Sequence, residues 1–287
     1  MFTGKTQNLG IMGWPVEHSL SPAMQNAALE AAGLDYAYIA LPTPPDRLAA
    51  AVEGLRALGF RGWNVTIPHK TAIIALLDEV SEDAGIIGAV NTVVHDGDIL
   101  RGYNTDIVGF GMGLESLGFP RGGHALVMGA GGAARAVIWS LVRAGAGRIS
   151  IGVRNPEKAE KTAGDFRPHA GATTIEVLHL ESAAFHEATA AADILVNTTP
   201  IGMYPAVNAM PPVDLALLPA RAPGYDIIYT PEKTRLLQEA EALGHPVQNG
   251  ELMLAGQGAE AFRLWTGHSP DIGKMIAVLR KILHTGG

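Results

Sequence analysis

The sequence predicts an α/β protein of two domains. Strand-like and helix-like segments alternate along the chain, which is the pattern of strand-helix-strand units with a mainly parallel sheet. A chain of 287 residues is long enough for two medium domains. Residues 118–123, Gly-Phe-Pro-Arg-Gly-Gly, interrupt the pattern with turn-forming residues and mark the boundary.

Composition excludes several classes of function. The apolar fraction of 47% and charged fraction of 17% are those of a globular protein, and the net charge of −7 contains no block of basic residues that would bind nucleic acid. Without cysteine the chain forms no disulfide and no thiolate site, so a reducing, cytoplasmic setting is expected. We predict neither a targeting segment nor a membrane span, because no basic start precedes a long apolar run and no charge-free stretch approaches roughly 20 residues.

The first half of the chain reads as strands separated by helices. β-Branched and aromatic residues predict strands over residues 9–13, 36–41, 61–67, 88–94 and 99–103. Helical periodicity covers residues 23–32, 46–58, 71–77 and 107–117. Ser21 before Pro22 predicts a helix start with serine as N-cap, and Asp96-Gly97 predicts a hairpin turn.

The segment N-V-T-I-P-H-K at residues 64–70 ends a strand, because Pro68 blocks its continuation. Asn64, Thr66 and Lys70 are therefore predicted at the carboxyl end of a strand, where open α/β sheets bind ligands. A lysine there can give a proton to an oxygen that is becoming an alkoxide. The alternative is a solvated lysine in the first turn of a helix.

Two other polar groups stand at helix starts. Ser19 and Ser21 flank one helix N-terminus, where free N–H groups favour a small anion such as a carboxylate, although capping alone accounts for Ser21. Asn104, Thr105 and Asp106 precede another helix, and only one of them can be its N-cap. An aspartate beside Lys70 would keep the ammonium charged and oriented.

The second half of the chain opens with a dinucleotide fingerprint. A strand over residues 124–128 precedes G-A-G-G-A-A-R-A at 129–136, which opens a helix to residue 144. Gly129 permits the tight turn, Gly131 permits close approach of a pyrophosphate, and Ala134 takes the place of the third glycine. The next strand, residues 149–153, ends in Val153-Arg154-Asn155 rather than in an acidic residue, which favours NADP over NAD unless Arg154 is only solvated.

The remaining segments continue the alternation. Strands are predicted over residues 173–178, 193–197 and 224–229, and helices over 247–265 and 271–283. N-T-T-P-I-G-M at 197–203 follows a strand end on the cofactor side, although turn chemistry also accounts for it. Gln257 lies among glycines on the penultimate helix and is either a cleft residue or a buried amide. The ten histidines lack metal-ligand spacing, so no metal site is predicted.

Taken together, these segments resemble the AroE-type shikimate and quinate/shikimate dehydrogenases over nearly the whole length. The matching motifs are H-S-L-S-P at 18–22, N-V-T-I-P-H-K at 64–70, G-A-V-N-T at 88–92, G-Y-N-T-D at 102–106, G-A-G-G-A at 129–133, N-T-T-P-I-G-M at 197–203, D-I-I-Y-T-P at 226–231 and N-G-E-L-M-L-A-G-Q at 249–257. Their order is far more specific than any one of them.

The resemblance implies an N-terminal α/β substrate domain with a mainly parallel sheet and a Rossmann-type NADP-binding domain. The implied division is residues 1–106 for substrate, 107–122 for a connecting helix and linker, 123–244 for the dinucleotide, and 245–287 for C-terminal helices that pack back toward the substrate domain. The implied activity is NADPH-dependent reduction of 3-dehydroshikimate to shikimate in aromatic amino acid biosynthesis, by a monomer or homodimer without nucleic-acid or membrane partners.

The resemblance also assigns residues to roles. Lys70 and Asp106 are the implied catalytic pair. The implied substrate-binding residues are Ser19, Ser21, Thr66, Asn91, Asp106, Tyr229 and Gln257. The implied cofactor-binding residues are Gly129, Ala130, Gly131, Gly132, Ala133, Val153, Arg154, Asn155, Ile227 and Gly250.

One departure and three alternatives stay open. The family's adenosine-side motif is N-R-T, whereas Val153-Arg154-Asn155 keeps the arginine and lacks the threonine hydroxyl. The first alternative is therefore a quinate/shikimate dehydrogenase with NAD or dual cofactor use. The others are a non-catalytic sensor that binds the dinucleotide and a related two-domain dehydrogenase that acts on a different carbonyl.

Overall fold

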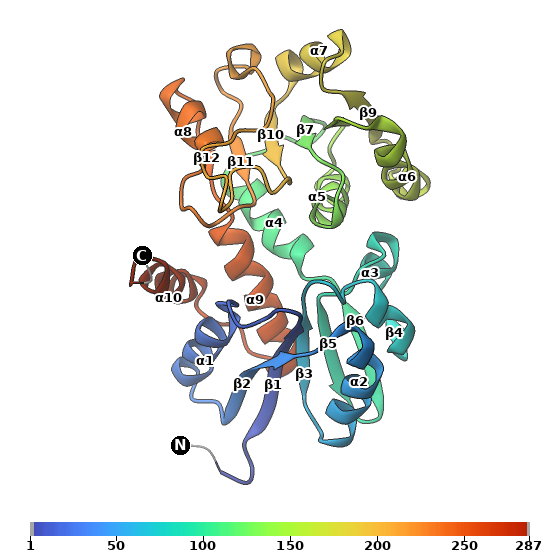
Figure 1. Ribbon diagram of the computed structural model, residues 1–287, viewed down its shortest axis with the longest axis vertical. Coiled ribbons are helices and arrows are strands. Elements are labelled where there is room, and N and C mark those ends of the chain that lie inside the picture. Colours follow the sequence, from blue (N-terminus) through green and yellow to red (C-terminus); the bar gives the residue numbers. More distant parts are fainter. Residues whose placement is uncertain (1–2, 286–287) are drawn as a thin grey trace. The chain divides into compact units, whose positions relative to one another are not determined.

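The computed structural model describes residues 3–285, which divide into two compact units (Figure 1). The first unit contains the described residues up to Gly109 and those from Ala255 onward, and the second is Phe110–Leu254. Two helices belong partly to each unit, α4 (Asp106–Ser116) and α9 (Glu251–Thr266). The finer four-part division drawn from the sequence stays a prediction. Over the described residues, no helix is both long enough and apolar enough to span a membrane.

The first unit is built on a six-stranded sheet whose order in the described residues is β2-β1-β3-β5-β6-β4. Its strands are β1 (Gln7–Gly13), β2 (Tyr36–Pro42), β3 (Gly62–Val65), β4 (Glu79–Val80), β5 (Thr92–Asp96) and β6 (Ile99–Tyr103). β1 pairs in parallel with β2 and β3, whereas β5 is antiparallel to β3 and β6. The predicted hairpin at Asp96-Gly97 is thereby confirmed, with Gly97 at the positive φ of 61° that such a turn favours.

Helices cover this sheet. They are α1 (Ser21–Ala31), α2 (Leu48–Ala57), α3 (Glu82–Ile87) and α10 (Ile272–Thr285), with short 3-10 turns η1 (Pro45–Arg47) and η2 (Ala72–Leu76). α1 packs beside α10. α9 packs against β3 and β5: Trp265 Nε1 donates to the carbonyl of Val93 in β5 at 2.9 Å, and the Trp265 ring fills the space that a Cβ on Gly62 of β3 would occupy. Trp63, fully buried, anchors the core between β3 and α2.

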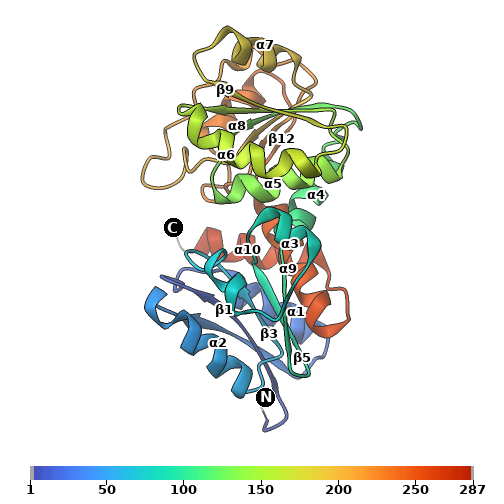
Figure 2. The same cartoon turned by 90° about the vertical axis from the view of Figure 1, so that its right-hand side faces the viewer.

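The second unit is a wholly parallel sheet in the described residues, of order β12-β11-β10-β7-β8-β9 (Figure 2). Its strands are β7 (His124–Met128), β8 (Arg148–Val153), β9 (Thr174–His179), β10 (Ile194–Asn197), β11 (Gly224–Asp226) and β12 (Val247–Gln248). Its further helices and turns are α5 (Gly132–Arg143), α6 (Pro156–Phe166), η3 (Arg167–His169), α7 (Ala183–Ala191), η4 (Leu215–Leu217) and α8 (Arg235–Ala242). The strand-helix alternation predicted from the sequence is therefore a doubly wound parallel sheet, and the predicted fold class is confirmed.

Three predicted boundaries are wrong for local reasons. The strand expected over 88–94 begins only at Thr92, because Gly88 closes α3 in the left-handed conformation and the next three residues form a loop. The strand expected over 224–229 ends at Asp226, whose side chain accepts the Ile228 N–H and turns the chain. Ser21 is the first residue of α1 and not its cap, since Leu20 holds the N-cap position without a side-chain hydrogen bond.

Candidate active site

Lys70 and Asp106 lie in direct contact in the first unit. The Lys70 Nζ donates to Asp106 Oδ2 at 2.7 Å, and the exposed fractions of the two side chains are 32% and 16%. Asn91 Nδ2 donates to the other carboxylate oxygen, Oδ1, at 2.9 Å. Each oxygen of Asp106 therefore has its own donor, which fixes the plane of the carboxylate and aims the ammonium. The backbone carbonyl of Lys70 also accepts the Val90 N–H at 2.8 Å, so the loop before β5 holds both partners.

The start of α4 positions Asp106. Asn104 Oδ1 accepts the Asp106 N–H at 3.2 Å, and Asn104 Nδ2 donates to the Ala89 carbonyl at 2.9 Å. Thr105 N donates to Asn91 Oδ1 at 2.8 Å. Asn104 and Thr105 are buried and bonded within the protein. Asp106 alone presents its side chain to Lys70.

A buried chain of hydrogen bonds runs behind this pair. The Tyr38 hydroxyl donates to Asn64 Oδ1 at 2.6 Å, and Asn64 Nδ2 donates to the Asn91 carbonyl at 3.2 Å and to Thr92 Oγ1 at 3.0 Å. Burial raises the pKa of Tyr38 well above its ordinary value, so the hydroxyl stays a donor. The sequence predicted Asn64 at the carboxyl end of a strand, and it is the third residue of β3. The Asn64 side chain is buried and holds the Asn91 backbone in place through a hydrogen bond.

The two serines lie at the start of α1. Ser19 Oγ accepts the Ser21 N–H at 3.3 Å, and Ser21 shares a side-chain hydrogen bond with Tyr38. Hydrogen bonds thus connect the serines through Tyr38 to the Asn91 network. The first turn of α1 contains no acidic residue, so nothing there opposes an anion at this helix end.

Thr66 and Gln257 occupy neighbouring elements of the same unit. Thr66 follows β3, and its N–H donates to the Met12 carbonyl at 2.8 Å, at the end of β1. Gln257 lies on α9 and is half-buried. The next residue, Gly258, accepts from Gln25 Nε2 of α1 at 2.9 Å, which ties α9 to the helix that Ser21 begins.

The second unit contains a cavity of about 620 Å³ over the glycine-rich turn. Among the predicted cofactor residues, its lining includes Gly129, Ala130, Gly131, Val153, Arg154 and Asn155. Gly129 has a φ of 99°, a conformation that side-chain-bearing residues rarely adopt. A Cβ on Gly131 would meet open space, so the surface beside this backbone is free for a ligand. Gly132 and Ala133 open α5 beside the cavity and are exposed.

Charge in this cavity comes from two residues. Arg154 is exposed at the end of β8 and was expected from the sequence. Lys158, in the first turn of α6, lines the same cavity and was missed, although its place four residues after Arg154 was a readable signal. Asn155 Oδ1 accepts the Lys158 N–H at 3.2 Å as the N-cap of α6, so this residue serves the helix whatever else it contacts.

Ile227 and Tyr229 follow β11, Gly250 lies between β12 and α9, and none of the three lines this cavity. Gly250 packs so tightly that a Cβ on it would lie 2.0 Å from the Ile227 carbonyl oxygen, and its N–H donates to Ile228 at 2.9 Å. Tyr229 is half-buried, and burial raises the pKa of its hydroxyl. The structure therefore brings Ile227 and Gly250 together.

Asp226 precedes this segment and is buried, and burial raises its pKa to about 6. Because the unfolded pKa is near 4, the folded protein holds this proton more tightly, and the corresponding stability is complete below about pH 4 and lost as the pH rises through 6. The difference in free energy of unfolding between wild type and Asp226→Asn, which does not titrate, is expected to fall by about 3 kcal/mol over that range. Urea unfolding of both proteins from pH 4 to 7.5 checks this, and a difference independent of pH would contradict it.

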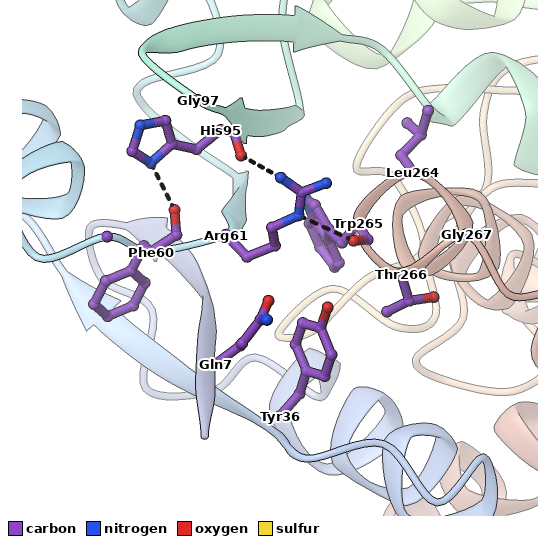
Figure 3. A pocket seen from close by; sticks show the side chains of 11 residues that line it. Gln7, Tyr36, Phe60, Arg61, His95, Gly97, Leu264, Trp265, Thr266 and Gly267 are labelled. Carbon is purple, nitrogen blue, oxygen red and sulfur yellow. Dashed lines mark hydrogen bonds between the residues drawn. The ribbon is translucent and has the colours of Figure 1, made fainter. Parts of the chain in front are cut away.

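A second cavity, of about 820 Å³, lies at the other end of the first sheet (Figure 3). Gln7 and Tyr36, which line it, begin β1 and β2, whereas the residues around Lys70 follow strand ends. Arg61 donates to the His95 carbonyl at 2.8 Å and to the Trp265 carbonyl at 3.3 Å, fastening α9 to the sheet. None of the predicted site residues lines this cavity, and the bonds of Arg61 there are structural.

Comparison with known proteins matches both ends of the chain to one family. Residues 11–93 match the shikimate dehydrogenase substrate binding domain and residues 250–280 the shikimate 5'-dehydrogenase C-terminal domain. Residues 125–215 match the family described as NADP oxidoreductase coenzyme F420-dependent. A shikimate dehydrogenase (NADP(+)) of Citrifermentans bemidjiense is 48% identical over 287 residues, which cover 99% of this chain and 98% of that protein. The chain belongs to the shikimate dehydrogenase family.

Solved structures agree with this membership. A shikimate dehydrogenase crystallised with NADP⁺ has a TM-score of 0.90 and 39% identity over 99% of this chain and 98% of its own. A ligand-free 5-ketofructose reductase of a Gluconobacter strain has a TM-score of 0.91 and 35% identity over 98% of this chain and 100% of its own. The shikimate dehydrogenase fold is thus shared by a named reductase of a different ketone, and the substrate has to be argued from the site.

Proposed function

We propose that this chain is an NADP-dependent shikimate dehydrogenase that reversibly reduces 3-dehydroshikimate to shikimate in aromatic amino acid biosynthesis. The observation that carries the proposal is the Lys70–Asp106 contact at 2.7 Å, fixed by Asn91, in a chain 48% identical over its length to a shikimate dehydrogenase. An isolated surface ion pair would not need a buried network behind it. This one is backed by Asn64 and Tyr38.

Lys70 is proposed as the group that moves the proton. Its Nζ donates to the oxygen of the substrate carbonyl as that oxygen becomes an alkoxide, and it takes the proton back in the reverse direction. Asp106 keeps the ammonium oriented and accepts a hydrogen bond from a substrate hydroxyl. Asn91 keeps Asp106 in place through Oδ1, which leaves Oδ2 for Lys70.

Ser19 and Ser21 are proposed to bind the substrate carboxylate. Their hydroxyls lie at the N-terminal end of α1, where unpaired N–H groups and the helix dipole favour negative charge. Thr66, Asn91, Tyr229 and Gln257 are the proposed partners of the ring hydroxyls. Hydroxyl and amide groups suit this task because each can both donate and accept.

NADP fits the cavity of the second unit. The open face beside Gly131, the left-handed turn at Gly129 and the N-terminus of α5 together suit a pyrophosphate. Arg154 and Lys158 present two cations where a 2′-phosphate would bind, and Ile227 and Gly250 are proposed beside the nicotinamide. When bound, the cofactor supplies the hydride that the ketone carbon accepts.

The decisive assay follows the loss of reduced-nicotinamide absorbance when 3-dehydroshikimate is added, with NADPH and NADH in parallel. We expect turnover with 3-dehydroshikimate and a preference for NADPH. The alternatives are separated by 5-ketofructose in this reduction assay and by shikimate and quinate in the reverse assay, which follows the gain of absorbance as NADP⁺ or NAD⁺ is reduced. Turnover of quinate with NAD identifies a quinate/shikimate dehydrogenase, turnover of 5-ketofructose alone identifies another reductase, and cofactor binding without any turnover identifies a sensor.

The cellular setting is part of the same proposal. A cytoplasmic enzyme acting as a monomer or homodimer on small molecules accords with a chain that has no cysteine and a net charge of −7. Neither nucleic acid nor membrane is proposed as a partner.

A further inference from the structure

Asp226 is a buried carboxylate that the proposed mechanism does not use. It ends β11 with no exposed surface. Its Oδ1 accepts hydrogen bonds from Asn197 Nδ2 and from the Ile228 N–H, both at 3.1 Å. Its Oδ2 accepts from Thr234 Oγ1 at 2.7 Å. One carboxylate therefore joins the end of β10, the turn after β11 and the start of α8.

The bond to Asn197 determines how the loop after β10 is held. Because the amide nitrogen of Asn197 faces Asp226, its Oδ1 faces the loop and accepts from Thr199 N at 3.0 Å and Thr199 Oγ1 at 2.7 Å. The same amide nitrogen donates to the Ile201 carbonyl at 3.4 Å. An amide has one accepting and one donating end, so an acceptor at position 226 selects the orientation that the loop needs.

This loop forms one wall of the cavity in the second unit. Thr198, Thr199 and Ile201 line the cavity. A Cβ on Gly129 would lie 2.9 Å from Thr199 Cγ2, so the loop rests directly on the glycine turn. Thr198 Oγ1 also donates to the Met128 carbonyl at 2.7 Å, at the end of β7. A shift of the loop would move the wall and release the turn.

The second hydrogen bond of Asp226 holds the turn after β11. Its bond to the Ile228 N–H fixes the residue next to Ile227, against whose carbonyl Gly250 packs. The third hydrogen bond of Asp226 holds Thr234, which caps α8 by accepting the Leu237 N–H. The carboxylate thus sits at the junction of the segments that carry Thr199 and Ile227.

We propose that Asp226 is a positioning residue for the cofactor, which holds residues 197–201 and the turn after β11 in the geometry that binds NADP. The inference rests on the proposed cofactor site. A carboxylate suits the position because it accepts from three donors at once, which an apolar residue cannot do. An unpaired Asn197 amide would be free to rotate and to draw the loop away from the cavity.

Asp226→Ala in the full chain tests this proposal. We expect the Kd and KM for NADPH to rise about tenfold or more, with a much smaller change in the KM for the ketone substrate, because misplacement of binding groups by about 1 Å can cost up to a hundredfold. Asp226→Asn retains an oxygen for Asn197 and Ile228 and is expected to restore NADPH binding to within about twofold of wild type, as a positioning role requires. Binding is measured by fluorescence titration at a temperature well below the unfolding transition of each variant.

Thr189→Val is the matched control for stability. Thr189 is also fully buried in the second unit, where its hydroxyl donates to the Phe185 carbonyl at 2.9 Å on α7. This variant is expected to lose stability and keep its Kd for NADPH. If Asp226→Ala behaves in the same way, the residue is only structural and the proposal is overturned.

Asn197→Ala keeps the test decisive should Asp226→Ala not fold. It removes the same hydrogen bond from the loop side, so it is expected to raise the Kd for NADPH. The Kd of the double variant is expected not to exceed that of the single variant that binds NADPH more weakly. An unchanged Kd for Asn197→Ala also overturns the proposal. The proposed function fails separately, when the wild type itself binds no NADPH.

Discussion

Lys70→Ala is expected to reduce kcat for 3-dehydroshikimate by about a thousandfold, within the 10²–10⁴ range that a positioned proton donor contributes. The substitution removes the ammonium that donates to Asp106 Oδ2 at 2.7 Å and leaves the backbone of the segment intact. Because the proposed cofactor residues belong to the other unit, the Kd for NADPH is expected to stay at the wild-type value. Steady-state turnover and fluorescence titration of NADPH measure the two quantities.

Two controls make this result specific to the proton. Lys5→Ala removes an exposed lysine far along the chain from the site and should leave kcat unchanged. Lys70→Arg keeps the positive charge but has a much higher pKa, so it is expected to recover only a small part of the activity. Near-normal turnover by Lys70→Ala would remove Lys70 from the mechanism and leave Asp106 without a partner for the reaction.

The paired substitution of Arg154 and Lys158 by alanine is expected to reduce the preference for NADPH over NADH by about a hundredfold. Hydrogen bonds to charged groups contribute about 1.5–3 kcal/mol each, and one tenfold step corresponds to about 1.4 kcal/mol. Each single variant should therefore lose about tenfold. The measurement is the ratio of kcat/KM for the two cofactors, and the loss should fall on NADPH alone because NADH lacks the 2′-phosphate.

Arg148→Ala is the matched control for this loss. Arg148 is an exposed arginine at the opposite end of the same strand, β8, where it pairs with Glu176. Its removal changes the net charge by the same amount as Arg154→Ala and should leave the cofactor ratio unchanged. An equal loss in both variants would mean that long-range charge, and not a local phosphate contact, determines the preference.

The sheet architecture was readable because its rules are local. Alternating strand and helix patterns imply parallel strands, and parallel strands end at one edge of a sheet. That logic predicted Lys70 at a strand end, whereas its pairing with Asp106, 36 residues away, was implied by the family resemblance. The glycine turn was equally readable, since a strand, glycines and a helix in that order leave few alternatives.

The misplaced residues are those whose environment is set by distant segments. In sequence, Asn64 is a polar residue near a strand end. Nothing local shows that its side chain accepts a hydrogen bond from Tyr38 and donates one to Thr92. Serine is a residue type favoured at the N-cap, but Ser21 is the first residue of the helix itself, and its side chain bonds to Tyr38. Asp226 was counted only as part of a motif, because its three donors come from three different segments.

Because β5 runs antiparallel to its neighbours β3 and β6, the length of the hairpin between β5 and β6 can vary. Since β5 starts just after Asn91 and β6 ends just before Asp106, these two residues are joined at the base of a ladder that begins with Thr92 opposite Tyr103. The separation of these two side chains is therefore independent of how far the hairpin extends. Its tip at Asp96-Gly97 can lengthen, shorten or acquire new contacts in descendants of this protein while the chemistry at the other end stays the same.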